Sequence, residues 1–90
     1  MFNSKNVIDI LVNKYNWIKS PDYSIYKISP SGDKVRYEAY FVRDRYLKLA
    51  DSTGILLDVD CDTLSEEESA EMFHEQTDWI DINYDEYHNP

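Results

Sequence analysis

Apolar residues near the N-terminus recur at the spacing of a helix. Four of them lie at positions i, i+1, i+4 and i+5 and so share one stripe: Val7, Ile8, Leu11 and Val12. This spacing predicts a helix over residues 4–15. Asn3 or Ser4 can cap it by accepting a hydrogen bond from a free backbone N–H group of the first turn, and Asn16 should end it.

The middle of the chain alternates apolar and polar residues with the period of two that is typical of strands. The clearest run is residues 34–42, and shorter runs cover residues 23–29, 46–50 and 55–62. In the last run we expect an inward-facing set of Ile55, Leu57, Val59 and Cys61. The expected outward-facing set of the same run is Leu56, Asp58, Asp60 and Asp62.

A second helix is predicted over residues 66–77. Ser65 and Glu68 have the spacing of a capping box, and Ala70, Phe73 and Thr77 should face inward. The segment from residue 78 onward has no clear assignment. Its apolar residues could pack in the core or in a subunit contact: Trp79, Ile80 and Ile82. Residues 84–90 are expected to form a loose tail.

The predicted order is helix, four strands, helix. Turn residues at 30–33 and 51–54, and a polar break or bulge at 43–45, separate the strands, and tight turns join antiparallel neighbours. A chain of 90 residues is long enough for one core. We therefore expect a single α+β domain over residues 1–90, with a four-stranded antiparallel β-sheet flanked by an N-terminal and a C-terminal helix.

Charge divides the chain into two unequal halves. All nine lysine and arginine residues lie in residues 1–50 beside five acidic residues, so this half carries +4. Residues 51–90 contain thirteen acidic residues and no lysine or arginine, so this half carries −13 and the whole chain −9. A net negative charge of this size opposes direct binding to nucleic acid or anionic lipid and attracts basic protein surfaces.

The sequence lacks the residues that several classes of function require. The single cysteine, Cys61, excludes an internal disulfide and a multi-cysteine zinc site. A calcium loop counted from Asp58 would need glycine at Thr63 and glutamate at Ser69. No nucleophile elbow, phosphate-binding loop, membrane-spanning apolar run or signal-peptide pattern is present. We therefore expect a cytoplasmic protein with no enzymatic activity, no metal site and no cofactor.

The acidic half is expected to hold carboxylates in ordered rows. Alternate residues of the strand at 55–62 recur about every 6.6–6.8 Å on one face, and Glu67, Glu71 and Glu75 recur about every 6 Å along a helix. Neighbouring phosphates on one DNA strand are also roughly 6–7 Å apart. The candidate phosphate-mimicking, partner-binding residues are Asp58, Asp60, Asp62, Glu66, Glu67, Glu68, Glu71, Glu75, Asp78, Asp81, Asp85 and Glu86.

These carboxylate rows, on a short chain rich in lysine, asparagine and tyrosine, resemble the small acidic phage-encoded DNA mimics that block host restriction or nuclease systems. Within that class the chain looks most like the Arn-type anti-restriction proteins of T-even phages. The resemblance rests on overall character and on the charge of residues 51–90, because DNA mimics share charge and not a motif. It implies a homodimer in the host cytoplasm that extends the charged surface and inhibits a modification-dependent restriction endonuclease.

Two other interpretations of the acidic half remain open. An immunity or antitoxin-type inhibitor would cap a basic nuclease with the same charges, and a few buried aromatic anchors, such as Trp79 or Tyr84, would carry most of its binding energy. An acidic surface can also serve only to keep a small protein soluble. Like charges at close spacing destabilise a fold by repulsion, which favours a role in binding.

Overall fold

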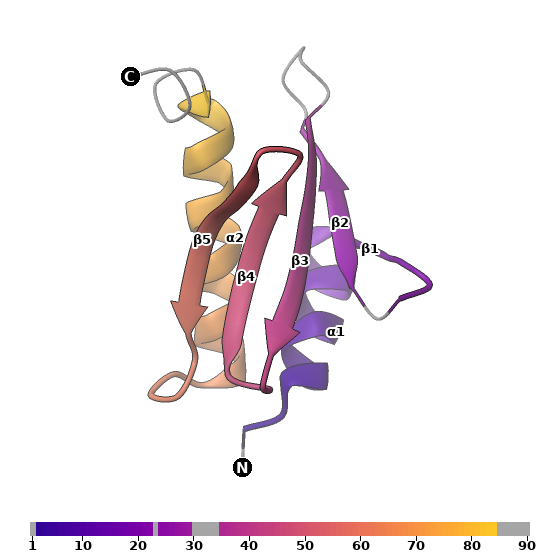
Figure 1. The fold of residues 1–90 in the computed structure, drawn as a ribbon. Coiled ribbons are helices and arrows are strands. Elements are labelled where there is room, and N and C mark those ends of the chain that lie inside the picture. Colours follow the sequence, from indigo (N-terminus) through magenta and orange to yellow (C-terminus); the bar gives the residue numbers. More distant parts are fainter. Residues whose placement is uncertain (1, 23, 30–34, 85–90) are drawn as a thin grey trace.

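The computed structural model describes residues 2–22, 24–29 and 35–84 as two helices packed on one antiparallel sheet. The elements in order are α1 (Ser4–Tyr15), β1 (Ile18–Lys19), β2 (Ile25–Ile28), β3 (Arg36–Val42), β4 (Tyr46–Asp51), β5 (Gly54–Asp60) and α2 (Glu66–Ile82). The strands lie in sequence order, and both helices cover the same face of the sheet (Figure 1). The predicted α+β class is confirmed.

Helix α1 begins and ends where the sequence predicts. The Asn3 side chain accepts a hydrogen bond from the backbone N–H of Lys5, and Asn16 adopts a left-handed conformation with φ 64° that ends the helix. Val7 and Leu11 are fully buried. Local capping and one apolar stripe are therefore sufficient to specify this element.

The sheet has five strands among the described residues, not the four that we expected. The additional strand, β1, is two residues long and pairs with β2 at the edge of the sheet, with Ile18 opposite Tyr26. The backbone N–H of Ser20 donates to the carbonyl of Ser24 at 2.9 Å and closes the turn between the two strands. Two residues are too few to show an alternating pattern, so only the pairing with β2 identifies this strand.

The predicted faces of β5 are wrong for Ile55, which was expected inside, and for Leu56, which was expected outside, whereas Leu57 packs against the core as predicted. Leu49 of β4 pairs with Leu57, but the next residue, Ala50, pairs with Ile55, so Leu56 is an extra residue in a β-bulge. Ile55 is consequently 51% exposed and Leu56 only 9% exposed. A bulge reverses the faces of the residues on one side of it, whereas Val59 remains buried as predicted.

Helix α2 has the predicted start but continues five residues beyond the predicted end. The capping box is confirmed: the backbone N–H of Glu68 donates to the Ser65 hydroxyl at 3.1 Å, and that of Ser65 donates to the Glu68 carboxylate at 3.3 Å. Ala70, Phe73 and Thr77 face the core as predicted. Among the described residues no helix combines the length and the apolar character that a membrane crossing requires.

A buried carboxylate holds the last turn of α2 against the sheet. Oδ1 of Asp81 accepts hydrogen bonds from the hydroxyl of Ser29, directly after β2, and from the hydroxyl of Tyr37 on β3, the latter at 2.9 Å. Burial and the Asp81 carboxylate both raise the pKa of Tyr37. This contact explains why α2 extends past residue 77. Nearby, the Tyr84 hydroxyl donates to Asp51 at 3.3 Å, and the remainder of the expected tail, residues 85–90, lies outside the described residues.

Candidate functional site

The outer side of α2 carries four exposed carboxylates, Glu67, Glu68, Glu71 and Glu75, which we call the α2 acidic row. Their positions follow from the helical period, because the buried residues Ala70, Phe73, Thr77 and Ile80 occupy the opposite side of the same helix. The capping box and the packing of this buried side hold the row on a rigid element.

The charge of the α2 acidic row is not neutralised within the described part of the chain. Helix α2 contains no lysine or arginine, and none of the ion pairs of the described residues includes Glu67, Glu68, Glu71 or Glu75. Among the described residues, the carboxylate of Glu68 accepts only the capping hydrogen bond of Ser65. Four negative charges therefore face solvent along about two turns of helix.

The carboxylates of β5 have a different environment, because basic side chains of β4 and of the preceding turn bind them. Asp58 lies 2.8 Å from Nζ of Lys48, its cross-strand partner. Asp60 accepts two hydrogen bonds of 2.8 Å from Arg45, and Asp62 lies 3.8 Å from the same guanidinium. The Arg45 guanidinium and the backbone N–H of Asp62 lower the pKa of Asp60 to about 2. Asp58 and Asp60 are thus exposed on the sheet face that the helices leave uncovered, but their charges are paired.

The remaining candidate carboxylates are distributed over other contacts. Glu66 accepts hydrogen bonds from the backbone N–H of Asn3 at 2.6 Å and from the Asn6 side chain at 3.2 Å, and so joins the starts of the two helices. Asp78 forms an ion pair with Lys27 at 2.9 Å. Asp81 is buried, and Asp85 and Glu86 lie outside the described residues. Of the ten candidates in the described part of the chain, the four of the α2 acidic row form one surface with no ion pair to another described residue.

Two large apolar side chains continue the outer side of α2 beyond the acids. Trp79 is 59% exposed and Ile82 is 81% exposed. They follow Glu75 at i+4 and i+7, which is the spacing of residues on one side of a helix. Ile80, between them, is buried. From the sequence, Trp79, Ile80 and Ile82 fitted either the core or a subunit contact. Continuing the helical period past residue 77 would have placed Ile80 on the buried side and the other two on the outer side.

The chain has no significant match among protein-family models, curated proteins or solved structures. Among the described residues, no three histidine, cysteine, aspartate or glutamate side chains are placed to hold a metal ion together.

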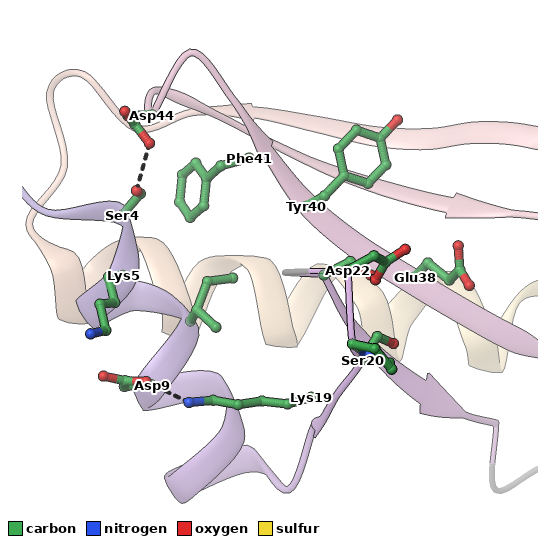
Figure 2. Close-up of a pocket in the computed structure, with 13 residues that line it drawn as sticks. Ser4, Lys5, Asp9, Lys19, Ser20, Asp22, Glu38, Tyr40, Phe41 and Asp44 are labelled. Atoms are coloured by element: carbon green, nitrogen blue, oxygen red, sulfur yellow. Dashed lines mark hydrogen bonds and ion pairs between the residues drawn. The ribbon is translucent and has the colours of Figure 1, made fainter.

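A groove of about 880 Å³ lies between the start of α1, β1 and the end of β3 (Figure 2). Charges of both signs line it, and some are already paired: Lys19 lies 3.3 Å from Asp9, and the Ser4 hydroxyl donates to Asp44 at 2.9 Å. None of its lining residues belongs to α2. The groove is thus separate from the α2 acidic row, and its lining mixes two lysines with four acidic side chains.

His74 lies on the side of α2 that faces α1. Its ring stacks on Tyr15 with centroids 4.2 Å apart, and Nε2 lies 3.3 Å from the Asp78 carboxylate. Nδ1 is buried without a hydrogen-bond partner among the described residues. Burial lowers the pKa of His74, and this effect outweighs the opposing effect of the Asp78 carboxylate.

We expect His74 to make the fold less stable in mild acid. Unfolded His74 takes up a proton near pH 6.5, whereas its lowered pKa keeps folded His74 neutral to lower pH, so the free energy of unfolding falls as the pH drops below about 6.5. Urea unfolding at about pH 7.5 and about pH 5.0 measures this loss. A His74→Gln variant should lose less stability between the two pH values, and an equal loss would contradict the assignment.

Proposed function

We propose that this protein is a DNA mimic: the α2 acidic row occupies the DNA-binding groove of a basic protein and blocks its access to DNA. The observation that carries the proposal is a rigid helix side with four carboxylates and no ion pair among the described residues. Ion pairing elsewhere in the fold cancels most exposed charge, as at Asp58 and Asp60. A surface of one sign that is left unpaired favours a partner of the opposite sign.

The spacing of the row supports the mimicry. Glu67, Glu71 and Glu75 are one helical turn apart, about 6 Å along the axis, and neighbouring phosphates on one DNA strand are roughly 6–7 Å apart. Basic side chains arranged for consecutive phosphates can therefore meet consecutive carboxylates. Because the helix is already ordered, this binding has no cost of folding the acidic segment.

The partner that this surface fits is a basic DNA-binding protein. The resemblance to Arn-type proteins suggests a modification-dependent restriction endonuclease in the host cytoplasm. The protein acts by occupying the site and not by chemistry, so the proposal includes no catalytic residue and no cofactor. Direct binding to nucleic acid is opposed by the net charge of −9.

Capture on the immobilised protein tests the function. Bacterial extract is applied at low salt, and the column is then developed either with duplex DNA or with rising salt. We expect a DNA-binding protein that duplex DNA displaces and that salt releases steeply, because a groove built for a polyanion binds it mainly by electrostatics. If neither treatment releases a DNA-binding protein, the acids serve another purpose, such as solubility.

The exposure of Trp79 favours one second candidate, an immunity-type inhibitor of a basic nuclease. Such an inhibitor depends on a few buried aromatic anchors more than on rows of charge. Its complex would dissociate at a rate that salt changes little, and duplex DNA would not displace it. The same column separates the two candidates.

A further inference from the structure

The outer side of α2 changes character along its length. Glu68, Glu71 and Glu75 are followed by Trp79 and Ile82 at successive spacings of three and four residues. This spacing keeps all five on one side of the helix, over about 21 Å. The N-terminal part of this side is acidic and its C-terminal part is apolar. We call Trp79 and Ile82 the apolar end of this side of α2.

The fold itself gives no reason for the exposure of the apolar end. In this turn of α2 the core contacts come from Ile80 and Asp81, both buried, while Trp79 is 59% exposed. Tryptophan is the residue type most enriched among the energetic centres of protein interfaces. An exposed tryptophan in line with unpaired charges therefore points to a contact that includes both.

A second copy of this chain is a poor occupant for this surface. Two α2 acidic rows brought together would place eight carboxylates in one interface, and α2 has no lysine or arginine to neutralise them. The homodimer implied by the resemblance to Arn-type proteins would have to form on another face. A cationic partner with an apolar pocket complements both parts of the surface.

Building on the proposed function, we propose that Trp79 and Ile82 anchor the same complex. The partner is then a DNA-binding protein whose phosphate-binding cations border an apolar pocket, of the kind that stacks an unpaired base, and the Trp79 indole occupies that pocket. Proteins that stack or extrude bases carry aromatic or apolar pockets beside their phosphate contacts. The acidic row then imitates the backbone, and the indole imitates a base.

The test uses the DNA-binding protein that duplex DNA displaces from the immobilised chain. Its affinity is measured over a range of salt for the parent, for Trp79→Ala and for Ile55→Ala, a matched control that removes an apolar side chain of similar exposure (51%) from the uncovered sheet face. We expect Trp79→Ala to bind roughly 30-fold more weakly or worse, with the salt dependence unchanged. Ile55→Ala should bind as the parent does.

Fluorescence reports the contact directly. Trp17 is buried in the core at 2% exposure, so quenching by acrylamide in the free protein comes mainly from Trp79. We expect the complex to protect Trp79 from the quencher. Parental affinity in Trp79→Ala, unchanged quenching in the complex, or a Trp79-dependent homodimer on sedimentation would overturn the inference and leave the DNA mimic standing. Failure to recover any DNA-displaceable partner would overturn both.

Discussion

Reversal of Glu67, Glu71 and Glu75 to lysine should abolish competition with duplex DNA while the fold survives. Each reversal adds two positive charges, so the net charge changes from −9 to −3. Even at about 1 kcal/mol per reversed contact, three reversals weaken binding by roughly 100-fold. The three side chains are exposed and form no ion pair among the described residues, so the helix keeps its packing. Displacement of labelled duplex DNA from the captured partner measures the effect, and circular dichroism measures the fold.

A second triple variant separates the acidic row from net charge. Asp22→Lys, Glu38→Lys and Asp58→Lys change the charge equally, but all three lie outside α2. Asp58 would lose an exposed ion pair with Lys48, which contributes little to stability. We expect this variant to keep most of its competition with DNA. Equal loss in both variants would mean that only net charge matters, and a fully active α2 variant would refute the DNA mimic.

Replacement of Asp81 by alanine should lower the free energy of unfolding by about 2–4 kcal/mol. The change removes the Oδ1 atom to which both Ser29 and Tyr37 donate, and it leaves the buried Tyr37 hydroxyl without that acceptor. It also frees the last turn of α2 from the sheet. A loss of this size is a large part of the total stability of a small domain, and urea unfolding at constant pH measures it.

Asp81→Asn is the matched control, because it removes the same negative charge but keeps an Oδ1 acceptor at the same position. It should lose clearly less stability than Asp81→Ala, since both hydroxyls retain an acceptor of weaker, uncharged type. If the two variants are equally stable, the hydrogen bonds of Asp81 do not hold the end of α2. Both variants remove one negative charge and so relieve repulsion among the acidic residues equally. The difference in stability between them therefore reports the hydrogen bonds.

Elements specified by local interactions were predictable at residue level. The bounds of α1 follow from Asn3, Asn16 and one apolar stripe, and the start of α2 follows from the Ser65 and Glu68 capping box. The α2 acidic row belongs to the same group, because the helical period alone turns it away from Ala70 and Phe73. In each case the decisive interactions join residues at most five positions apart.

Features that depend on distant partners were not predictable. Pattern alone left Asp58, Asp60 and Asp81 equivalent to the helix glutamates as candidate phosphate mimics. In the structure Lys48 and Arg45 pair the first two, and Asp81 is buried against side chains more than forty positions away. The bulge at Leu56 likewise arises from pairing with β4, which no alternation within β5 encodes.

The division between the two kinds of feature has a physical basis. The charge split and the periodic placement of Glu67, Glu71 and Glu75 are properties of the chain read locally, and they are sufficient to predict an ordered acidic surface. Tertiary contacts then decide which carboxylates remain unpaired, because a cation or a buried hydroxyl brought near by the sheet cancels or hides the others. They also decide that Ile80 is buried while Trp79 and Ile82 stay on the outer side. The surface that results is narrower than the acidic half of the chain: one side of α2, with an apolar end.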